Sequence, residues 1–317
     1  MKTLLFIAPY FFSYEKYIAN ELEKLGYKVY IIYENVEEFS YLSKLMIKLK
    51  GDKQTYYDNY YKKKISSIKF DLVLVIRGSF LSLDVINYIK EYSPNAKFYM
   101  YQWDSVNNNS NALEIASSFD QVSTFDIHDA EKYKWNYRPL FYINSSSRVG
   151  SRKYDVAYIC TLHSQRIRVF QKLKKIDGKK YLYLYSKFSH FIKERYFHKN
   201  IDFDGISLND VEFKPLSLEQ VNVVMGESNI IIDYTHPAQT GFTMRTCESI
   251  GHRCKLVTNN KLVKEADFYN ENNIYIYDTD NFEIPDSFLK IPFTELPQEV
   301  FNRYSISSWI KEIIDYE

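Results

Sequence analysis

Short runs of consecutive apolar residues, separated by helical patterns, constrain the fold of this chain more than any other feature. In the first half of the chain these runs lie at residues 4–8, 29–33, 72–76, 97–101 and 122–125. Apolar residues occupy both faces of such strands, which is typical of parallel sheets that helices cover on both sides. Helical patterns at 14–25 and 83–92 lie between the runs. The sequence therefore predicts an α/β domain with a parallel sheet.

The same alternation begins again after a polar stretch at 144–153 that has the composition of a linker. Further strands are predicted at 156–160, 181–185, 229–232, 254–257 and 274–277, and further helices at 165–174, 217–225, 243–250 and 305–316. Ser217 and Gln220 have the spacing of a capping box at the start of one helix. We predict two Rossmann-like domains, at 1–145 and 146–304, and a terminal helix at 305–317.

Charge, cysteine content and hydropathy exclude several classes of protein. The chain has 317 residues and a formal net charge of +1, so its overall charge gives no reason to expect nucleic acid as a partner. Cys160, Cys247 and Cys254 lack the paired spacing of disulfide or zinc sites. No apolar stretch reaches the ~18 residues that a membrane-spanning helix needs. We expect a cytoplasmic protein.

The segment at 233–260 carries the most specific pattern in the chain. It follows the apolar strand at 229–232 and passes through a turn containing Pro, Gly and Thr into a short helix, which Gly251 is expected to end. A strand, a glycine turn and a helix start present backbone N–H groups and a positive helix end to a phosphate. Arg245 adds a cation in the first helical turn, and Glu248 lies about one turn further on the same face. The pattern predicts a site for a diphosphate and a ribose.

This order of residues resembles the donor-binding motif of GT-B glycosyltransferases, in which a glycine turn precedes a helix with a Glu and a Gly, and a short strand ends in Thr-Asn. The corresponding residues here are Glu248, Gly251 and 258–259, with a shorter spacing from Glu to Gly. More narrowly, the pattern Gln-x-Gly-x-Thr-x-Arg-x-x-Glu at 239–248 looks like bacterial transferases of capsule and lipopolysaccharide synthesis. The resemblance implies two Rossmann-like domains whose parallel sheets face a central cleft, with a C-terminal helix that returns to the first domain.

The resemblance also implies a function. It suggests transfer of a sugar from a nucleotide-sugar to a saccharide or undecaprenyl-linked saccharide acceptor in surface polysaccharide synthesis. The donor-binding residues that it implies are Arg166, His236, Gln239, Thr240, Gly241, Thr243, Arg245 and Glu248. In the alternative interpretation the glycines only turn the chain, Arg245 and Glu248 form a surface ion pair, and Arg166 is a solvent-facing helix charge.

One departure from the family concerns the mechanism. Many retaining members carry a second Glu on the N-terminal side of the ribose Glu, and this chain has Thr240 there. An inverting mechanism is favoured, and the resemblance implies neither a metal nor another cofactor. Two further hypotheses stay open: a non-catalytic nucleotide-sugar-binding subunit, and a GT-B-like sugar-nucleotide epimerase.

Acceptor binding and general-base catalysis are expected in the first domain. Ligands bind beyond the carboxyl ends of parallel strands, which selects the segments 9–13, 77–79 and 103–105. Asp104 is the first candidate for the base and Asp126 the second, and each has the alternative role of capping a helix. The candidate acceptor-binding residues are Tyr10, Ser13, Arg77 and Trp103.

Residues 41–64 form a basic stretch that begins with Tyr41 and ends with Lys64. It contains seven Lys interleaved with Leu, Met, Ile and Tyr. Each Lys close to an anionic bilayer contributes about 1 kcal/mol of attraction, so the stretch is suited to rest on the cytoplasmic face of the inner membrane. The alternative is a solvated helical face.

Overall fold

The computed structural model describes residues 1–34, 53–66, 68–147, 150–163, 165–198, 203, 205–236 and 239–316. The chain divides into two compact units. The first comprises Met1–Leu140, Ala238–Gly241 and Ile306–Glu317, and the second comprises Phe141–Pro237 and Phe242–Ser305. This grouping differs from the predicted division in three places. Residues 141–145 and Ser305 belong to the second unit, and the short segment Ala238–Gly241 belongs to the first.

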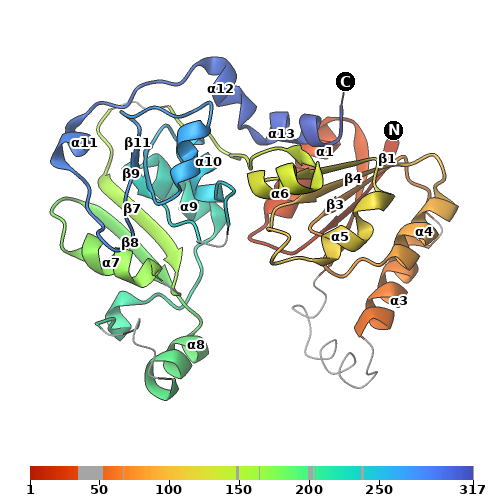
Figure 1. Ribbon diagram of the computed structural model, residues 1–317, viewed down its shortest axis with the longest axis horizontal. Helices are drawn as coiled ribbons and strands as arrows, with labels where there is room; N and C mark the ends of the chain where they lie inside the picture. The colour runs from red at the N-terminus through yellow and green to blue at the C-terminus, as the bar shows by residue number, and fades with distance from the viewer. Residues whose placement is uncertain are drawn as a thin grey trace. The chain divides into compact units, whose positions relative to one another are not determined.

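The first unit is built on a parallel sheet of six strands in the order β2-β1-β3-β4-β5-β6 (Figure 1). The strands are β1 (Lys2–Ala8), β2 (Tyr27–Tyr33), β3 (Leu72–Ile76), β4 (Lys97–Gln102), β5 (Gln121–Thr124) and β6 (Asn136–Tyr137). Its helices are α1 (Tyr14–Lys24), α3 (Lys53–Ile65), α4 (Leu83–Tyr92), α5 (Asn111–Ile115), α6 (Ile127–Tyr133) and α13 (Ile306–Ile313). All five residues of β3 are buried, as the continuous apolar run predicts.

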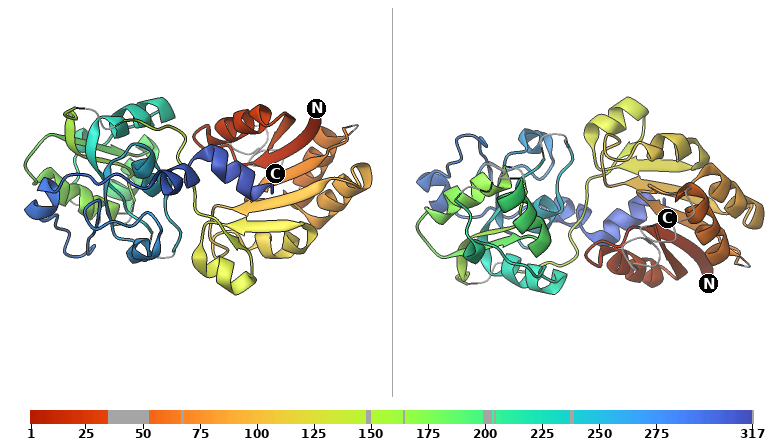
Figure 2. Two further views of the ribbon diagram at one scale, coloured as in Figure 1. Left: turned by 90° about the horizontal axis from the view of Figure 1, so that it is seen from above. Right: turned by 90° about the horizontal axis from the view of Figure 1, so that it is seen from below.

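Helices cover both faces of this first sheet. Buried side chains of α3, α4 and α5 form one core with Leu5, Val73 and Met100 of the strands. On the opposite face lie α1 and the terminal helix α13, which Figure 2 shows in red and dark blue. Trp309 of α13 is fully buried, and its ring centroid lies 4.7 Å from that of Tyr101 in β4. The C-terminal helix thus returns to the first unit, as predicted.

The second unit holds a parallel sheet of five strands in the order β11-β10-β9-β7-β8. The strands are β7 (Tyr154–Thr161), β8 (Lys180–Tyr185), β9 (Ser228–Ile232), β10 (Lys255–Thr258) and β11 (Ile274–Ile276). The helices are α7 (Arg166–Lys174), α8 (Phe188–Ile192), α9 (Leu218–Gly226), α10 (Met244–Gly251), α11 (Asp286–Lys290) and α12 (Gln298–Arg303). A π-helical turn, Lys193–Phe197, continues α8.

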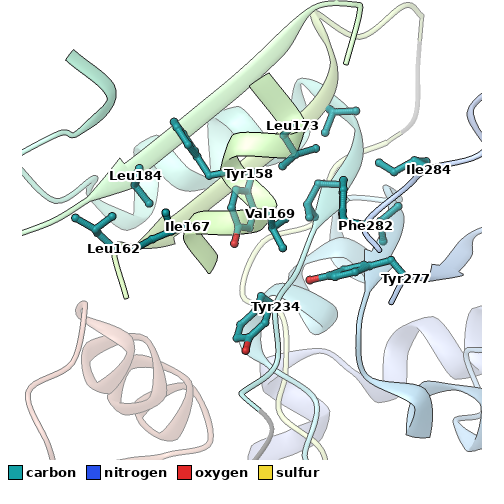
Figure 3. Close-up of a cluster of buried hydrophobic side chains, with 14 of the residues drawn as sticks. Tyr158, Leu162, Ile167, Val169, Leu173, Leu184, Tyr234, Tyr277, Phe282 and Ile284 are labelled. Atoms are coloured by element: carbon teal, nitrogen blue, oxygen red, sulfur yellow. The ribbon is translucent and has the colours of Figure 1, made fainter. Parts of the chain in front are cut away.

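The core of the second unit lies mainly between its sheet and α7. Tyr158 of β7, Val169 of α7 and Tyr277 converge in this cluster (Figure 3). On the other face Val221 and Met225 of α9 pack against the sheet. The predicted capping box starts α9 as expected. The Ser217 side chain accepts a hydrogen bond from the N–H of Gln220, and the Gln220 side chain accepts one from the N–H of Ser217.

Gly251 is the last residue of α10, so the helix ends where it was predicted to end. Its backbone is not left-handed, however, and the turn is made by Arg253 with φ 51°. Gly251 is needed for another reason. A Cβ there would lie 2.6 Å from both the carbonyl oxygen of Asn144 and the ring of Tyr142, so only glycine lets these segments pack.

The structure describes only part of the basic stretch at 41–64. Residues 41–52 lie outside the described residues, and the remainder forms most of α3. Tyr57, Tyr61 and Ile65 of this helix are buried in the core of the first unit. One side of α3 is therefore core, and Lys53, Lys63 and Lys64 are exposed on the rest of the helix.

Candidate functional site

The N-terminus of α10 is anchored through Thr243. Its hydroxyl accepts a hydrogen bond from the N–H of Thr246 at 3.3 Å and donates one to Asp233 at 2.8 Å. Thr243 is therefore the N-cap of α10 and also ties the helix to the residue that follows β9. The predicted order of strand, turn and helix is present, and the start of the helix faces the carboxyl end of β9.

Arg245 and Glu248 form an ion pair on the first turns of α10. The Glu248 side chain is 4% exposed and that of Arg245 is 24% exposed. The alternative of a pair on the surface is therefore wrong, because the carboxylate is buried. A buried carboxylate beside a partly open guanidinium can accept hydrogen bonds from a bound ligand while the cation faces its phosphates.

Asp233 is a buried carboxylate surrounded by threonines. Four threonine hydroxyls donate hydrogen bonds to its carboxylate: Thr243 at 2.8 Å, Thr235 at 3.3 Å, Thr246 at 3.4 Å and Thr258 at 3.2 Å. Burial raises the pKa of Asp233, while these hydrogen bonds and the charge of Arg166 oppose the rise. Asp233 joins β9, β10 and α10, so its role here is structural.

The Thr-Asn pair that ends β10 reinforces the same junction. The Asn259 side chain accepts from the N–H of Thr235 at 2.8 Å and donates to the carbonyl oxygen of Thr235 at 3.0 Å. Its neighbour Thr258 contacts Asp233. This part of the motif therefore holds the backbone beyond β9 in place.

Arg166 begins α7, next to the end of β7. It donates to the Nε2 atom of His163 at 2.9 Å and to the carbonyl oxygen of Tyr234 at 3.4 Å, and it lies 5.7 Å from the ring centroid of Tyr234. Burial, and then the charge of Arg166, lower the pKa of His163 to about 4. His163 is therefore neutral at pH 7, with its proton on Nδ1, since a guanidinium can only donate. Arg166 is consequently not a solvent-facing helix charge.

His236 is exposed and lies close enough to His163 for their charges to interact. Within the second unit the predicted donor-binding residues Arg166, His236, Thr243, Arg245 and Glu248 thus follow β7 and β9, whose carboxyl ends share one edge of the parallel sheet. Arg166 and Arg245 both lie near the Cys160 thiol at the end of β7.

The remaining predicted donor residues, Gln239, Thr240 and Gly241, group with the first unit. Thr240 binds Asp126 twice, with its N–H 3.0 Å and its hydroxyl 2.6 Å from the carboxylate oxygens. A Cβ on Gly241 would lie 2.2 Å from the ring of Phe125. Glycine is therefore required at 241 for close packing.

Asp126, the second candidate for the base, is the N-cap of α6. Besides Thr240, the backbone N–H groups of His128 and Asp129 donate to it at 3.1 Å and 3.2 Å. A buried carboxylate that accepts four hydrogen bonds is a structural cap, so the structure gives no support to Asp126 as a general base.

Asp104 has different surroundings. It follows β4, its side chain is 33% exposed, and its single ion-pair partner among the described residues is Arg77, at 3.9 Å. Burial raises the pKa of Asp104, and the Arg77 charge opposes the rise. A carboxylate that is partly open and has few hydrogen bonds keeps its oxygens available for a proton.

Arg77 occupies a strained position between two carboxylates. Its φ is 71°, in the left-handed region that residues other than glycine rarely adopt. The backbone is held by the side chains of Gln102 and Asn109, which donate to its carbonyl oxygen at 2.7 Å and 2.8 Å. Its guanidinium pairs with the fully buried Glu34. Glu34 was not among the predicted site residues, although it follows β2 at the edge that the strand-end rule selects.

Aromatic side chains line the loop between β1 and α1. Tyr10, Phe11 and Phe12 are 42%, 46% and 50% exposed. Phe11 lies 5.8 Å from Trp103, measured between ring centroids. Ser13 precedes α1 with φ 67°, and its side chain makes no capping hydrogen bond. Tyr10, Ser13, Arg77 and Trp103 therefore follow β1, β3 and β4, which are neighbours in the sheet.

A small cavity of about 260 Å³ in the first unit lies apart from these residues. It is lined by Gln121, Ser123, Asn136, Tyr137, Arg138, Glu312 and Ile313. Arg138 is buried there, and its ion pair with Glu312 of α13 spans 2.6 Å. The cavity contains none of the predicted site residues.

Within the residues that the structure describes, no three His, Cys, Asp or Glu side chains gather as a metal ion would require. Among the helices of the described part of the chain, none is long and apolar enough to cross a bilayer.

Comparison with known proteins adds information on the fold. No protein-family model matches the chain, and no curated protein does. The crystal structure of Anabaena Alr3699/HepE in complex with UDP and glucose matches with a TM-score of 0.51 at 11% identity, over 99% of this chain and 95% of that chain. The same Anabaena protein in complex with UDP-glucose gives a TM-score of 0.51 at 10% identity, with the same coverage.

A further match is E. coli heptosyltransferase WaaC with ADP-2-deoxy-2-fluoro heptose, at a TM-score of 0.39 and 10% identity, over 99% of both chains. At this level of similarity only the fold is informative, and the two HepE structures carry that conclusion. Each of the two units is an α/β unit with a parallel sheet, and the chain has the GT-B fold class.

Proposed function

We propose that this protein is a glycosyltransferase that moves a sugar from a nucleotide-sugar donor to a saccharide or lipid-linked saccharide acceptor. The observation that carries the proposal is the Arg245–Glu248 pair on α10, which starts beside the carboxyl end of β9. A buried carboxylate, a partly open guanidinium and a helix N-terminus are complementary to a ribose and a diphosphate.

The donor residues have separate tasks in this proposal. Glu248 accepts hydrogen bonds from the ribose hydroxyls, and the Arg245 guanidinium binds the phosphates. Arg166 adds a second cation near the end of β7, with its orientation set by His163 and the carbonyl of Tyr234. Together with the start of α10, the two cations stabilise the negative charge that develops on the departing diphosphate.

Asp104 is the proposed general base. The acceptor hydroxyl oxygen attacks the anomeric carbon, its proton passes to the Asp104 carboxylate, and the bond from the anomeric carbon to the diphosphate oxygen breaks. The diphosphate leaves with the electron pair, and the configuration at the anomeric carbon is inverted. The raised pKa of Asp104 improves its match to a proton-transfer role near neutral pH.

The acceptor is assigned to the first unit. Trp103 and the exposed rings of Tyr10 and Phe11 offer flat apolar surfaces that suit the faces of a saccharide. We place the reaction in bacterial surface polysaccharide synthesis, on the cytoplasmic face of the inner membrane, with an undecaprenyl-linked saccharide as the acceptor class. The proposed catalysis uses neither a metal nor another cofactor, because Arg166, Arg245 and the helix end supply the positive charge.

The test is a donor panel. Because HepE has been crystallised with UDP-glucose, UDP-sugars come first, followed by ADP- and GDP-sugars, each with a lipid-linked acceptor and mass spectrometry of the products. A product heavier by one glycosyl residue is the expected result. Nucleotide binding without any turnover would indicate a non-catalytic subunit, and isomerised donor without transfer would indicate an epimerase.

The phosphate contacts are tested separately. Arg245→Gln and Arg166→Gln remove one charge each while keeping an extended polar side chain. We expect both variants to bind a nucleoside diphosphate more weakly than wild type while their affinity for the nucleoside is almost unchanged. Calorimetry measures both ligands, and an equal loss for the two would contradict phosphate binding.

A further inference from the structure

The segment from Lys187 to His198 in the second unit exposes several large aromatic side chains. Phe188, Tyr196 and Phe197 are 58%, 54% and 78% exposed. They belong to α8 and to the π-helical turn that continues it, and α8 lies beyond the end of the second sheet (Figure 1). The surfaces of soluble proteins seldom expose three large aromatic residues within ten positions of the sequence. Their exposure here indicates a surface that a membrane or another molecule covers.

The segment that carries the exposed rings is anchored in the core of the second unit. Phe191, in the same helix, is fully buried in the core of the second unit and lies 6.2 Å from Phe203 and 5.9 Å from Phe213 between ring centroids. The Arg195 guanidinium donates to the carbonyl oxygen of Phe203. The buried side of the segment therefore packs in the core, and this packing fixes the position of the exposed aromatic side chains.

Charge on the same segment identifies the partner. Lys187 and Lys193 are exposed, and within the described residues neither forms an ion pair. Arg195 is a third cation, whereas the carboxylate of Glu194 is engaged by His198 at 2.9 Å. Exposed aromatic rings flanked by cations are complementary to the interface of an anionic bilayer, where the rings enter the headgroup region and the cations meet lipid phosphates.

The position of the segment in the fold supports this partner. β8 ends at Tyr185, immediately before α8, and β8 runs parallel to β7 and β9. The segment therefore leaves the same edge of the sheet that carries Asp233 and the start of α10. Only β7 separates β8 from β9, which corresponds to about 10 Å across the sheet.

We propose that the segment Lys187–His198 is a membrane-binding surface that docks the second unit on an anionic lipid bilayer. The surface is distinct from the basic stretch at 41–64. It brings the nucleotide-binding edge of the second unit close to the bilayer, where a lipid-linked acceptor resides. This consequence rests on the proposed function, but lipid binding itself needs neither a nucleotide nor catalysis.

The experiment is sedimentation of the full chain with vesicles of phosphatidylcholine, with and without added phosphatidylglycerol. Lys187→Gln/Lys193→Gln removes two charges, each worth about a fivefold change in affinity for anionic lipid, so binding falls roughly 25-fold. Phe188→Ser/Phe197→Ser should lower binding about tenfold or more. Both variants should keep the wild-type affinity for nucleoside diphosphates.

Matched controls lie in the same unit. Val223 of α9 is 59% exposed, so Val223→Ser removes a similarly exposed apolar group, and Lys172→Gln/Lys175→Gln removes two exposed charges at the end of α7. These variants should sediment as wild type does. The proposal is overturned if wild type ignores anionic vesicles at low salt, or if the segment variants bind as wild type does. Self-association that the Phe variant abolishes, without vesicle binding, would assign the surface to a second copy of the chain.

Discussion

The carboxyl ends of β4 and β9 each lead into an aspartate, but the two residues have opposite surroundings. Asp233, after β9, is 3% exposed and accepts hydrogen bonds from four threonine hydroxyls. Asp104, after β4, has a 33% exposed side chain and a single ion-pair partner among the described residues, Arg77 at 3.9 Å. Burial raises the pKa of both.

The comparison shows that position at a strand end does not assign a role. A carboxylate whose lone pairs are already used cannot accept a proton from a substrate without losing contacts that hold the fold. Asp126 supports the same rule, since its four hydrogen bonds make it a cap of α6. Among these three aspartates, Asp104 alone combines partial exposure with few hydrogen bonds.

The largest effect is expected for Asp104→Asn, which keeps the shape of the side chain but removes the proton acceptor. General-base catalysis typically contributes about 10²- to 10⁴-fold, so we expect turnover to fall by that order. Donor affinity should stay close to wild type. The measurement is kcat at saturating donor and acceptor beside donor Kd. A marginal loss of turnover would remove Asp104 as the base, and a joint loss of donor binding and thermal stability would make it structural.

Asp233→Ala tests the opposite half of the comparison. It leaves four threonine hydroxyls without their shared acceptor, so we expect the free energy of unfolding to fall by about 3 kcal/mol. The matched variant Asp104→Ala should cost less than about 1 kcal/mol, because Asp104 supports no comparable network. Urea denaturation measures both. Equal losses would mean that the hydrogen-bond count does not separate the two residues.

Glu248→Ala tests whether the buried carboxylate on α10 binds a ribose. We expect nucleotide binding to weaken by roughly 1.5–3 kcal/mol, the range for hydrogen bonds to charged groups, while the fold survives. Calorimetry against several nucleoside diphosphates is the measurement. If every nucleotide that binds wild type binds the variant equally well, Glu248 serves only to hold Arg245.

The smallest effect concerns the pH dependence that Arg77 imposes on Asp104. As a base, Asp104 must be deprotonated, so turnover rises with pH through its raised pKa. The double variant Glu34→Gln/Arg77→Gln removes the opposing charge without leaving Glu34 buried as an unpaired carboxylate. The pKa of Asp104 should then rise further, and the acid limb of the kcat profile should move to higher pH.

The single variant Glu34→Gln is the control, because it leaves the Arg77 charge free to favour the Asp104 carboxylate. Its acid limb should move down in pH or remain where it is. An acid limb that stays at the wild-type pH in the double variant would show that the limb reports another group.

Local patterns in the sequence were sufficient for most of the architecture. The continuous apolar runs predicted β1, β3 and β4 and the parallel sheets, because a strand without polar alternation must be covered on both faces. The spacing of Ser217 and Gln220 predicted the start of α9, and the spacing of Arg245 and Glu248 predicted their shared helix face. Each of these inferences needs contacts within a few residues.

The helices α3 and α6 were predicted only as alternatives, for different reasons. The hydrophobic side of α3 is made of tyrosines among lysines, so its buried face is not evident from apolar residues alone. The start signal of α6 is Asp126, whose position after a strand also fitted a catalytic base. An aspartate at such a position has two interpretations, and only its hydrogen bonds decide between them.

The sequence by itself determined the fold class, the alternation of strands and helices, and the residue types gathered at two sheet edges, because these depend on periodicity and near neighbours. Tertiary structure alone decided which carboxylates are satisfied and which stay open. The threonines around Asp233 come from positions 235, 243, 246 and 258, and Asp126 meets Thr240 across 114 positions. Hydrogen bonding over such separations depends on packing, which local sequence patterns do not encode.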